Sequence, residues 1–109
     1  MNPEEALTLK PDYWKLYNNI GIIYNKLKEY NIAEKYFNKA IKYYIKALEL
    51  DPHNYITNYS IASSFYKKEN YDNAIKYSKK AISLNSSFVS AYNNLANCDL
   101  TPFFLRVKT

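Results

Sequence analysis

The sequence is poor in the residues on which most metal sites and phosphate-binding loops depend. Of its 109 residues, one is glycine, one is cysteine and one is histidine. A single glycine, Gly21, cannot build the Gly-rich loop of a dinucleotide site or a P-loop. Cys98 alone allows neither an internal disulfide nor an all-cysteine zinc site, and His53 alone cannot supply a two-histidine site. We therefore expect no metal, no cofactor and no autonomous enzyme.

Long hydrophobic runs are absent as well. No stretch of about 18 apolar residues occurs, so we expect no insertion into a membrane. Residues 1–5, Met-Asn-Pro-Glu-Glu, are acidic and lack an apolar segment, so no secretory signal is expected. The resulting expectation is an intracellular protein, with no distinction between cytoplasm and nucleus.

What the chain does contain is apolar, aromatic and basic. Hydrophobic residues make up 48% and aromatic residues 17%, which is enough for one domain to bury a core. The formal net charge is +5, and all the cationic residues but one arginine are lysines. This charge permits nucleic acid, acidic peptides or anionic lipid as partners. However, Lys, Asn, Tyr and Ile are abundant together, as an AT-rich coding sequence would produce without a functional cause.

Two patterns recur along the chain with the same spacing. The segment ALTLKP at residues 6–11 returns as ALELDP at 47–52 and, weakened, as AISLNS at 81–86. The second pattern is YxxIGxxY at 17–24, NxxIAxxF at 58–65 and YxxLA at 92–96. In both patterns, the same number of residues separates each copy from the next. Two independent patterns with the same spacing are not expected by chance.

Each recurring unit is predicted to be a pair of helices. Apolar residues fall three and four apart, which is the spacing of one helix face. Small residues recur where two helices could approach closely, and a larger side chain there would force the helix axes apart. These small residues are Gly21, Ala62 and Ala96 on first helices and Ala33 and Ala74 on second helices, with Tyr24, Tyr36, Phe37 and Phe65 filling the space beside them.

Polar residues indicate the helix ends. Asp12, Asn54 and either Ser86 or Ser87 lie just before the predicted first helices and are expected as N-caps. The turns within the pairs are predicted at residues 30–31 and 70–72. Asparagine in these turns can cap a helix or adopt the left-handed conformation that glycine usually supplies.

These residues resemble the tetratricopeptide repeat (TPR), whose pattern W-x2-L-G-x2-Y…A-x3-F…P extends over about 34 residues. The resemblance covers residues 6 to about 98. It implies an all-α fold in which antiparallel helix pairs form a right-handed superhelix. We expect the repeat region to span residues 1–101, as a partial repeat at 1–12, a long repeat at 14–54, a standard repeat at 55–88 and a partial repeat at 89–101, followed by a non-repeat tail at 102–109.

The repeat at 14–54 is seven residues too long, and we place the excess in its second helix. There Ala33-x-x-x-Phe37-x-x-Ala40 is repeated at once by Ala40-x-x-x-Tyr44-x-x-Ala47. Seven residues are nearly two turns, so the apolar seam stays on almost the same face. The lengthened helix should run about 10 Å beyond its neighbours.

The two ends of the repeat region are incomplete. Solenoids need polar terminal caps, and none is identifiable here. Pro102 is expected to stop the last helix. We therefore expect a fragment, a truncated form or a protein that a partner completes, and self-association through the uncapped ends is the corresponding prediction.

TPR proteins hold peptides or partner segments on a concave surface lined by first helices. The resemblance therefore implies a non-catalytic interaction scaffold whose partner is a protein or peptide rather than a small-molecule substrate. Carried over by position, the surface residues are Lys15, Asn18, Asn19, Ile22 and Asn25, then Ile56, Tyr59, Ser60, Ser63 and Tyr66, then Ser90, Asn93, Asn94 and Asn97.

Two other uses of the family bear on these positions. Asn19, Ser60 and Asn94 are equivalent and resemble the asparagine ladder of some TPR proteins, which implies the substrate-presenting arm of a larger, glycosyltransferase-like enzyme. Asparagine is abundant throughout the chain, which weakens this alternative. The clamp for chaperone tails requires lysine and arginine at positions that hold none here, so that use is not expected.

The lysines form a pattern of their own. Lys35, Lys39, Lys42 and Lys46 are four, three and four residues apart and share one face of the long helix, and Lys76 and Lys80 are equivalent to Lys35 and Lys39. We predict a basic stripe on the outer, convex side. A solvated helix face is the simpler interpretation. Attachment to RNA, DNA or an acidic protein is the alternative, with nucleic acid not the expected partner.

For four aromatic residues and the cysteine, we expect a structural role before a role in binding or reactivity. Trp14, Tyr24, Phe37 and Phe65 are expected in the core or as a cover for it, and Cys98 as a small buried residue. Tyr43, on the lengthened helix, is left open between a core residue and an interface anchor.

Overall fold

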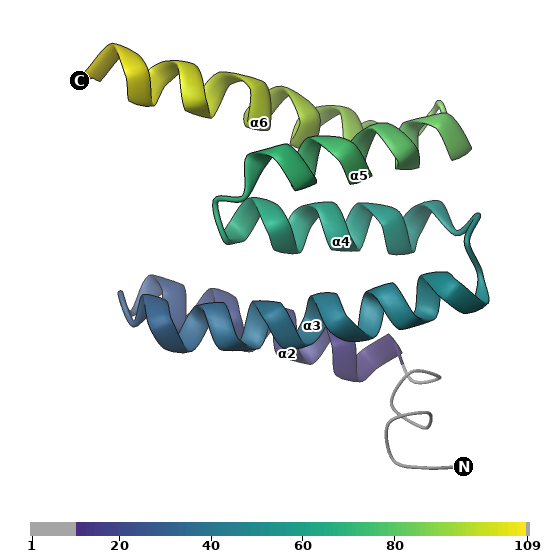
Figure 1. Ribbon diagram of the computed structural model, residues 1–109, viewed down its shortest axis with the longest axis horizontal. Coiled ribbons are helices and arrows are strands. Elements are labelled where there is room, and N and C mark those ends of the chain that lie inside the picture. The colour runs from purple at the N-terminus through teal and green to yellow at the C-terminus, as the bar shows by residue number, and fades with distance from the viewer. Residues whose placement is uncertain (1–10, 109) are drawn as a thin grey trace. The chain divides into compact units, whose positions relative to one another are not determined.

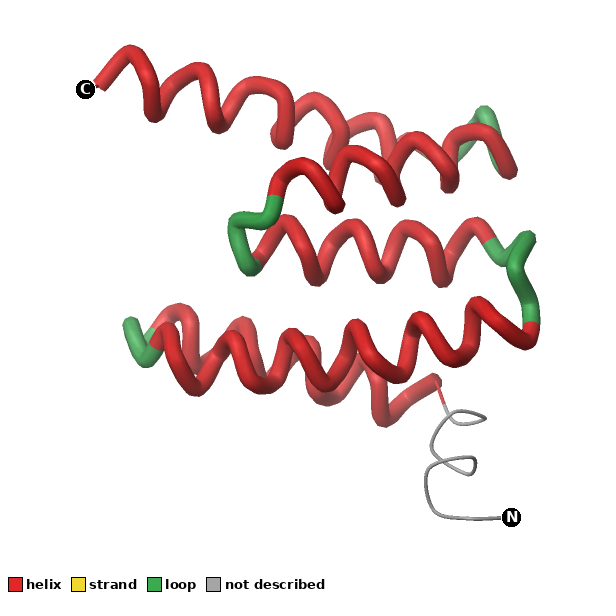
Figure 2. The backbone as a smooth tube through the Cα atoms, in the orientation of Figure 1, coloured by secondary structure: helices red, strands yellow, loops and turns green. Residues whose placement is uncertain are grey.

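The computed structural model describes the backbone of residues 11–108 and the side chains of residues 14–98. This part of the chain is all-α and contains no strand (Figure 2), which confirms the predicted fold class. Residues 1–10, where most of the first partial repeat is predicted, lie outside the described part. The helices are α2 (Pro11–Lys26), α3 (Tyr30–Leu50), α4 (Tyr55–Lys67), α5 (Tyr71–Leu84) and α6 (Val89–Lys108).

The chain divides after Pro52 into two compact units. The first unit contains the pair α2 and α3, which pack against each other along their length. In the second unit α5 packs against both α4 and α6, and α4 also contacts α6. Consecutive helices within each unit run antiparallel, so α4 and α6 point in the same direction (Figure 1).

The predicted lengthening of one second helix is confirmed. α3 has 21 residues and α5, its counterpart in the second unit, has 14. The difference is the seven residues of the repeated segment and corresponds to about 10 Å of helix. The edge-on contact between the rings of Trp14 and Tyr44, at 5.6 Å between centroids, places the second copy of the segment beside the start of α2.

The packing of α2 against α3 at Gly21 leaves no room for a side chain. A Cβ atom on Gly21 would lie 2.7 Å from Cε1 of Phe37, well inside van der Waals contact. Phe37 itself is 1% exposed, so its ring fills the space that the missing side chain leaves. Ala62, at the equivalent position of α4, is fully buried too. Small residues therefore set the helix spacing in both units, as predicted.

The predicted core residues divide by depth. Trp14, Phe37 and Cys98 are buried, whereas Tyr24 and Phe65 are half-buried. Tyr43, for which the sequence left two roles open, is buried and its ring stacks on that of Tyr17. Tyr43 is thus a packing residue at the α2–α3 seam.

Two asparagines cap helices as predicted. Oδ1 of Asn54 accepts a hydrogen bond from the backbone N–H of Thr57 at 3.1 Å, at the start of α4. Oδ1 of Asn70 accepts one from the N–H of Asn73 at 3.4 Å, at the start of α5. Each bond satisfies one of the N–H groups that the first turn of a helix leaves without a partner.

The predicted positions of the turns were wrong. Residues 30 and 31 already belong to α3, and of residues 70–72 only Asn70 precedes α5, which begins at Tyr71. The left-handed residues are Lys28, with φ of 63°, and Glu69, with φ of 64°. They stand at equivalent positions of the two repeats, each directly before the donor of a closing hydrogen bond. In each case the following N–H donates back to the carbonyl five residues earlier, Glu29 to Tyr24 at 2.9 Å in the first turn. This closing bond requires a left-handed residue just before the donor, whatever its side chain.

Three other predicted helix ends were also wrong. Asp12 lies inside α2 rather than before it. Neither Ser86 nor Ser87 directly precedes α6, because Phe88 stands there. Ser87 belongs to the loop, where its N–H donates to Oδ1 of Asn85 at 3.1 Å. α6 continues through Pro102 to Lys108. A proline removes one backbone hydrogen bond of a helix and leaves those of the later turns available.

Candidate binding surface

The predicted surface residues of the first unit share one side of α2. Lys15 and Asn19 are exposed, and Asn18, Ile22 and Asn25 are half-buried. Their spacing of three and four residues places them on one helix face. Gly21, which faces Phe37 of α3, lies on the packed side of α2 next to this face. The face that α2 presents beside its seam with α3 therefore carries three amides, one ammonium group and one apolar side chain.

The surface of α4 is more aromatic. Ile56 is 52% exposed, and Tyr59, Ser60, Ser63 and Tyr66 are half-buried. The hydroxyl of Ser60 donates to the backbone carbonyl of Ile56 at 2.9 Å, so toward a ligand it offers acceptor lone pairs only.

The tyrosines of this surface are held by other rings. The ring of Tyr59 meets the edge of Phe88 at 5.1 Å, with 74° between the planes. Phe88 also lies 5.1 Å from Tyr55, so one ring braces two residues of α4. At the other end of the helix, Tyr66 packs against Tyr71 at 5.8 Å. These contacts fix the orientation of the exposed ring edges.

Phe88 is the residue of this site that sequence reasoning missed. It directly precedes α6, in the loop that connects α6 to α5. The one available signal was an aromatic residue immediately before a predicted first helix. At the corresponding position of the preceding repeat stands Asn54, so the repeat pattern gave no expectation of a ring.

The residues of α6 divide between the open and the packed side. Ser90, Asn93 and Asn97 are exposed. Asn94 is 8% exposed, and its Nδ2 donates to the hydroxyl of Ser78 on α5 at 3.2 Å. The amide of Asn94 therefore joins α6 to α5, and the third position of the proposed asparagine ladder lies inside the helix packing.

One tyrosine of the second unit has a shifted pKa. Burial raises the pKa of the Tyr71 hydroxyl above 10.0, and the nearby Glu69, Tyr66 and Cys98 raise it further, which keeps Tyr71 neutral. Among the described side chains, no three His, Cys, Asp or Glu residues gather where they could hold a metal ion. None of the described helices has the length and the apolar character needed to cross a membrane.

Antiparallel helix pairs that recur in phase with the sequence define a helical-repeat protein. Family models described as tetratricopeptide repeat match residues 14–43, and residues 37–54 together with 56–88. These matches cover well over half of the chain, which therefore belongs to the tetratricopeptide repeat family. A comparison with curated proteins gives no match.

The family matches also bear on the lengthened helix. The two models overlap at residues 37–43, inside α3. An overlap at this place is what two successive copies of a seven-residue segment produce, because either copy can complete a repeat. TPR units generally mediate protein–protein interactions and are typically non-catalytic.

Proposed function

We propose that this chain is a non-catalytic scaffold that binds a peptide segment or a partner helix on its first helices. In the first unit the binding surface is the exposed side of α2. In the second unit it is the side that α4 and α6 present together. The observation that supports the proposal best is the arrangement of the second unit, where two first helices contact each other and run in the same direction (Figure 1).

Equivalent positions of parallel, neighbouring helices lie side by side. When α6 is aligned with α4 by one standard repeat length, Asn93 corresponds to Tyr59 and Asn97 corresponds to Ser63. The α4–α6 surface therefore offers rows in which a ring or a hydroxyl on α4 neighbours an amide on α6. Asn93 and Asn97 are exposed, so a ligand can reach their amides.

The chemistry of these rows fits a peptide backbone. An asparagine side chain carries both a donor and an acceptor and can pair with a peptide group regardless of the peptide's sequence. Tyr59 adds a rigid, half-exposed ring that is already braced by Phe88, and aromatic rings contribute large contact areas at low entropic cost. We therefore expect an extended ligand with an apolar side chain near Tyr59.

The test is selection of peptides from a displayed random library, followed by affinity measurements with variants. Asn93→Ala combined with Asn97→Ala removes two exposed amides and leaves the buried residues of α6, Ala91, Asn94 and Cys98, unchanged. Since a hydrogen bond contributes about 0.5–1.5 kcal/mol, the double variant should bind the selected peptides about tenfold more weakly.

A matched control changes exposed residues of α5 instead. Asp72→Ala combined with Lys79→Ala leaves the net charge unchanged and lies outside the proposed surface. Circular dichroism checks that both double variants fold. Selected peptides that bind all the proteins equally well would place the binding site elsewhere and refute this proposal.

The prediction of self-association through the uncapped ends is separate. Ala96 of α6 is exposed, although its equivalents Gly21 and Ala62 are buried under a second helix. We expect a mass that rises with concentration in sedimentation experiments. A monomer mass that stays constant over a wide dilution range would contradict this expectation.

A further inference from the structure

A seven-residue pattern, A-x-K-Y-x-x-K, occurs three times on the second helices. It spans residues 33–39 and 40–46 of α3 and residues 74–80 of α5. The seven residues that lengthen α3 are thus a complete second copy, with its own tyrosine and pair of lysines. The binding surface proposed above uses none of these residues.

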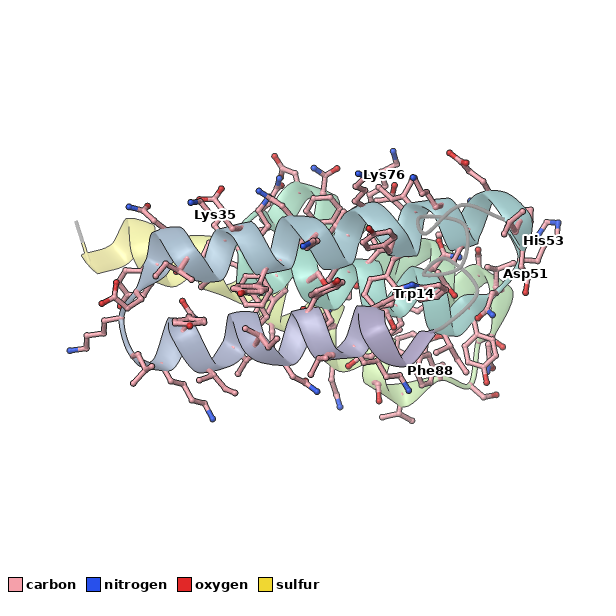
Figure 3. All side chains as sticks on the ribbon, turned by 90° about the horizontal axis from the view of Figure 1, so that it is seen from below. Trp14, Lys35, Asp51, His53, Lys76 and Phe88 are labelled. Carbon is pink, nitrogen blue, oxygen red and sulfur yellow. The ribbon has the colours of Figure 1, made fainter. Side chains whose placement is uncertain are left out.

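The two copies in α3 produce one continuous row of lysines. At 3.6 residues per turn, the four lysines fall within a sector of about 60° and extend over about 16 Å of helix. Lys35, Lys39 and Lys42 are exposed, and Lys35 points away from α2 (Figure 3). Glu49, one turn after Lys46, marks the end of the row. The row and the tyrosines beside it are called the Lys–Tyr face: Lys35, Tyr36, Lys39, Lys42, Tyr43 and Lys46.

The tyrosines of this face are stacked along the α2–α3 seam. Tyr36 stacks on Tyr24 at 5.8 Å, with 5° between the ring planes. Tyr43 stacks on Tyr17 at 6.0 Å, with 18° between the planes. A tilted contact at 6.5 Å between Tyr17 and Tyr36 joins the two pairs into one series of rings. The rings therefore border the lysine row over its length.

Three of the four ammonium groups lie over rings of this series. Nζ of Lys39 is 4.9 Å from the ring centroid of Tyr17. Nζ of Lys42 and Nζ of Lys46 are 5.8 Å and 6.0 Å from that of Tyr43. Such contacts attract a cation to the ring face. They restrict the lysine side chains before any ligand binds, which lowers the entropic cost of binding.

We propose that the Lys–Tyr face of α3 binds an acidic helix of a partner protein. A helix whose carboxylates recur at intervals of four, three and four residues presents them in one row, with the length and spacing of the lysine row. Complementary rows of charge attract and set the register of the two helices. This surface lies on a second helix, so the proposal is independent of the peptide site on the first helices.

Single-stranded nucleic acid fits the same face less well. Proteins of that class stack bases on free aromatic faces, whereas these rings stack on one another or carry a lysine. Phosphate recognition also favours the forked guanidinium of arginine. All four cations here are lysines, and the one arginine of the chain, Arg106, belongs to α6.

The probe is a fluorescently labelled, alanine-rich helical peptide whose four glutamates stand at i, i+4, i+7 and i+11. A second peptide carries the same glutamates distributed around the helix, and a labelled oligouridine represents nucleic acid. Anisotropy titrations use the full chain at low salt. The test variant is Lys35→Gln with Lys39→Gln and Lys42→Gln, all on the face. The control is Lys26→Gln with Lys67→Gln and Lys79→Gln, three exposed lysines on other helices.

Both triple variants lower the net charge by three, so they separate the face from charge alone. We expect the ordered peptide to bind more tightly than the distributed one. We also expect the test variant to bind the ordered peptide at least about tenfold more weakly than the wild type does, and the control variant less than about threefold more weakly. Three results would overturn it: no binding of the ordered peptide at low salt, equal losses in both variants, or tighter binding of the oligouridine than of the ordered peptide. Circular dichroism checks that both variants fold.

Discussion

Replacement of Gly21 by alanine tests whether one missing methyl group sets the distance between α2 and α3. The added Cβ would lie 2.7 Å from Cε1 and 2.8 Å from Cδ1 of Phe37. Because Phe37 is buried and protein interiors are close-packed, we expect its ring to move only by displacing neighbouring side chains. Overpacking of this kind costs about 1–3 kcal/mol, while alanine in a helix gains about 1 kcal/mol over glycine. The packing cost outweighs the gain, and we expect Gly21→Ala to destabilise the protein by about 1 kcal/mol.

The assay is urea unfolding followed by circular dichroism. With a slope of about 2 kcal/mol per molar urea, a loss of about 1 kcal/mol lowers the midpoint by about 0.5 M. Ala96→Gly is the control, since Ala96 occupies the same repeat position on α6 but is exposed. It should cost about 1 kcal/mol through helix propensity alone.

A double variant assigns the effect to the proposed contact. Phe37→Leu shortens the opposing side chain, so Gly21→Ala should be tolerated better in that background, with a coupling of at least about 0.5 kcal/mol. If Gly21→Ala instead stabilised the wild-type protein by about 1 kcal/mol, helix propensity alone would account for it. The close approach of Phe37 to Gly21 would then be refuted.

Three further predictions concern helix ends and one titrating group. Asn54→Ala should cost about 1 kcal/mol in urea unfolding, because the N–H of Thr57 loses its cap, and Asn54→Ser should restore most of the loss. Lys28→Gly and Glu69→Gly should each stabilise the protein by up to about 1 kcal/mol, since glycine adopts positive φ without strain; a loss of stability would contradict the left-handed turns. The pKa of Tyr71 is raised in the folded protein, so the folded state holds this proton more tightly than the unfolded chain. The stability that this difference in pKa contributes is fully present below about pH 10, and it is lost as the pH rises through the pKa of the folded state. Tyr71→Phe should therefore lose less stability than the wild type between about pH 9 and about pH 12, measured by urea midpoints.

The helix pairing could be predicted from the sequence because small residues report directly on helix contacts. Gly21 and Ala62 stand in one repeat phase, and both are buried where a second helix approaches. The repeated segment in α3 was equally readable, since seven residues add nearly two full turns and preserve the face.

The turns could not be predicted from side chains. Lys28 and Glu69 adopt positive φ because the backbone closes each first helix with a hydrogen bond that spans five residues. Neither residue type favours that conformation, so the sequence carried no signal for it. The asparagines that drew attention instead serve as caps, or, for Asn31, as part of the first turn of α3.

The sequence predicted which helix faces form the candidate site. It did not predict where the exposed side of each helix ends and the packed side begins. Asn94 and Asn97 are three residues apart on α6, yet one is buried and the other exposed. The difference depends on how α6 is rotated against α5, which brings Ser78 within 3.2 Å of the Asn94 amide. Ser78 belongs to the preceding helix, and no local spacing rule connects the two residues.

The open side of α6 has a consequence for how the second unit comes apart. Val89 and Tyr92 are 66% and 45% exposed, so one side of the start of α6 is open. α6 packs mainly against α5 and touches α4 less, whereas α5 packs extensively against both α4 and α6. In a linear array each element resists opening through its immediate neighbours. Amide protons of α6 should therefore exchange with deuterium before those of α5. A peptide that bridges Tyr59 and Asn93 would join α6 to α4 and slow that exchange, so isotope uptake in α6 would report occupancy of the surface without any label on the ligand.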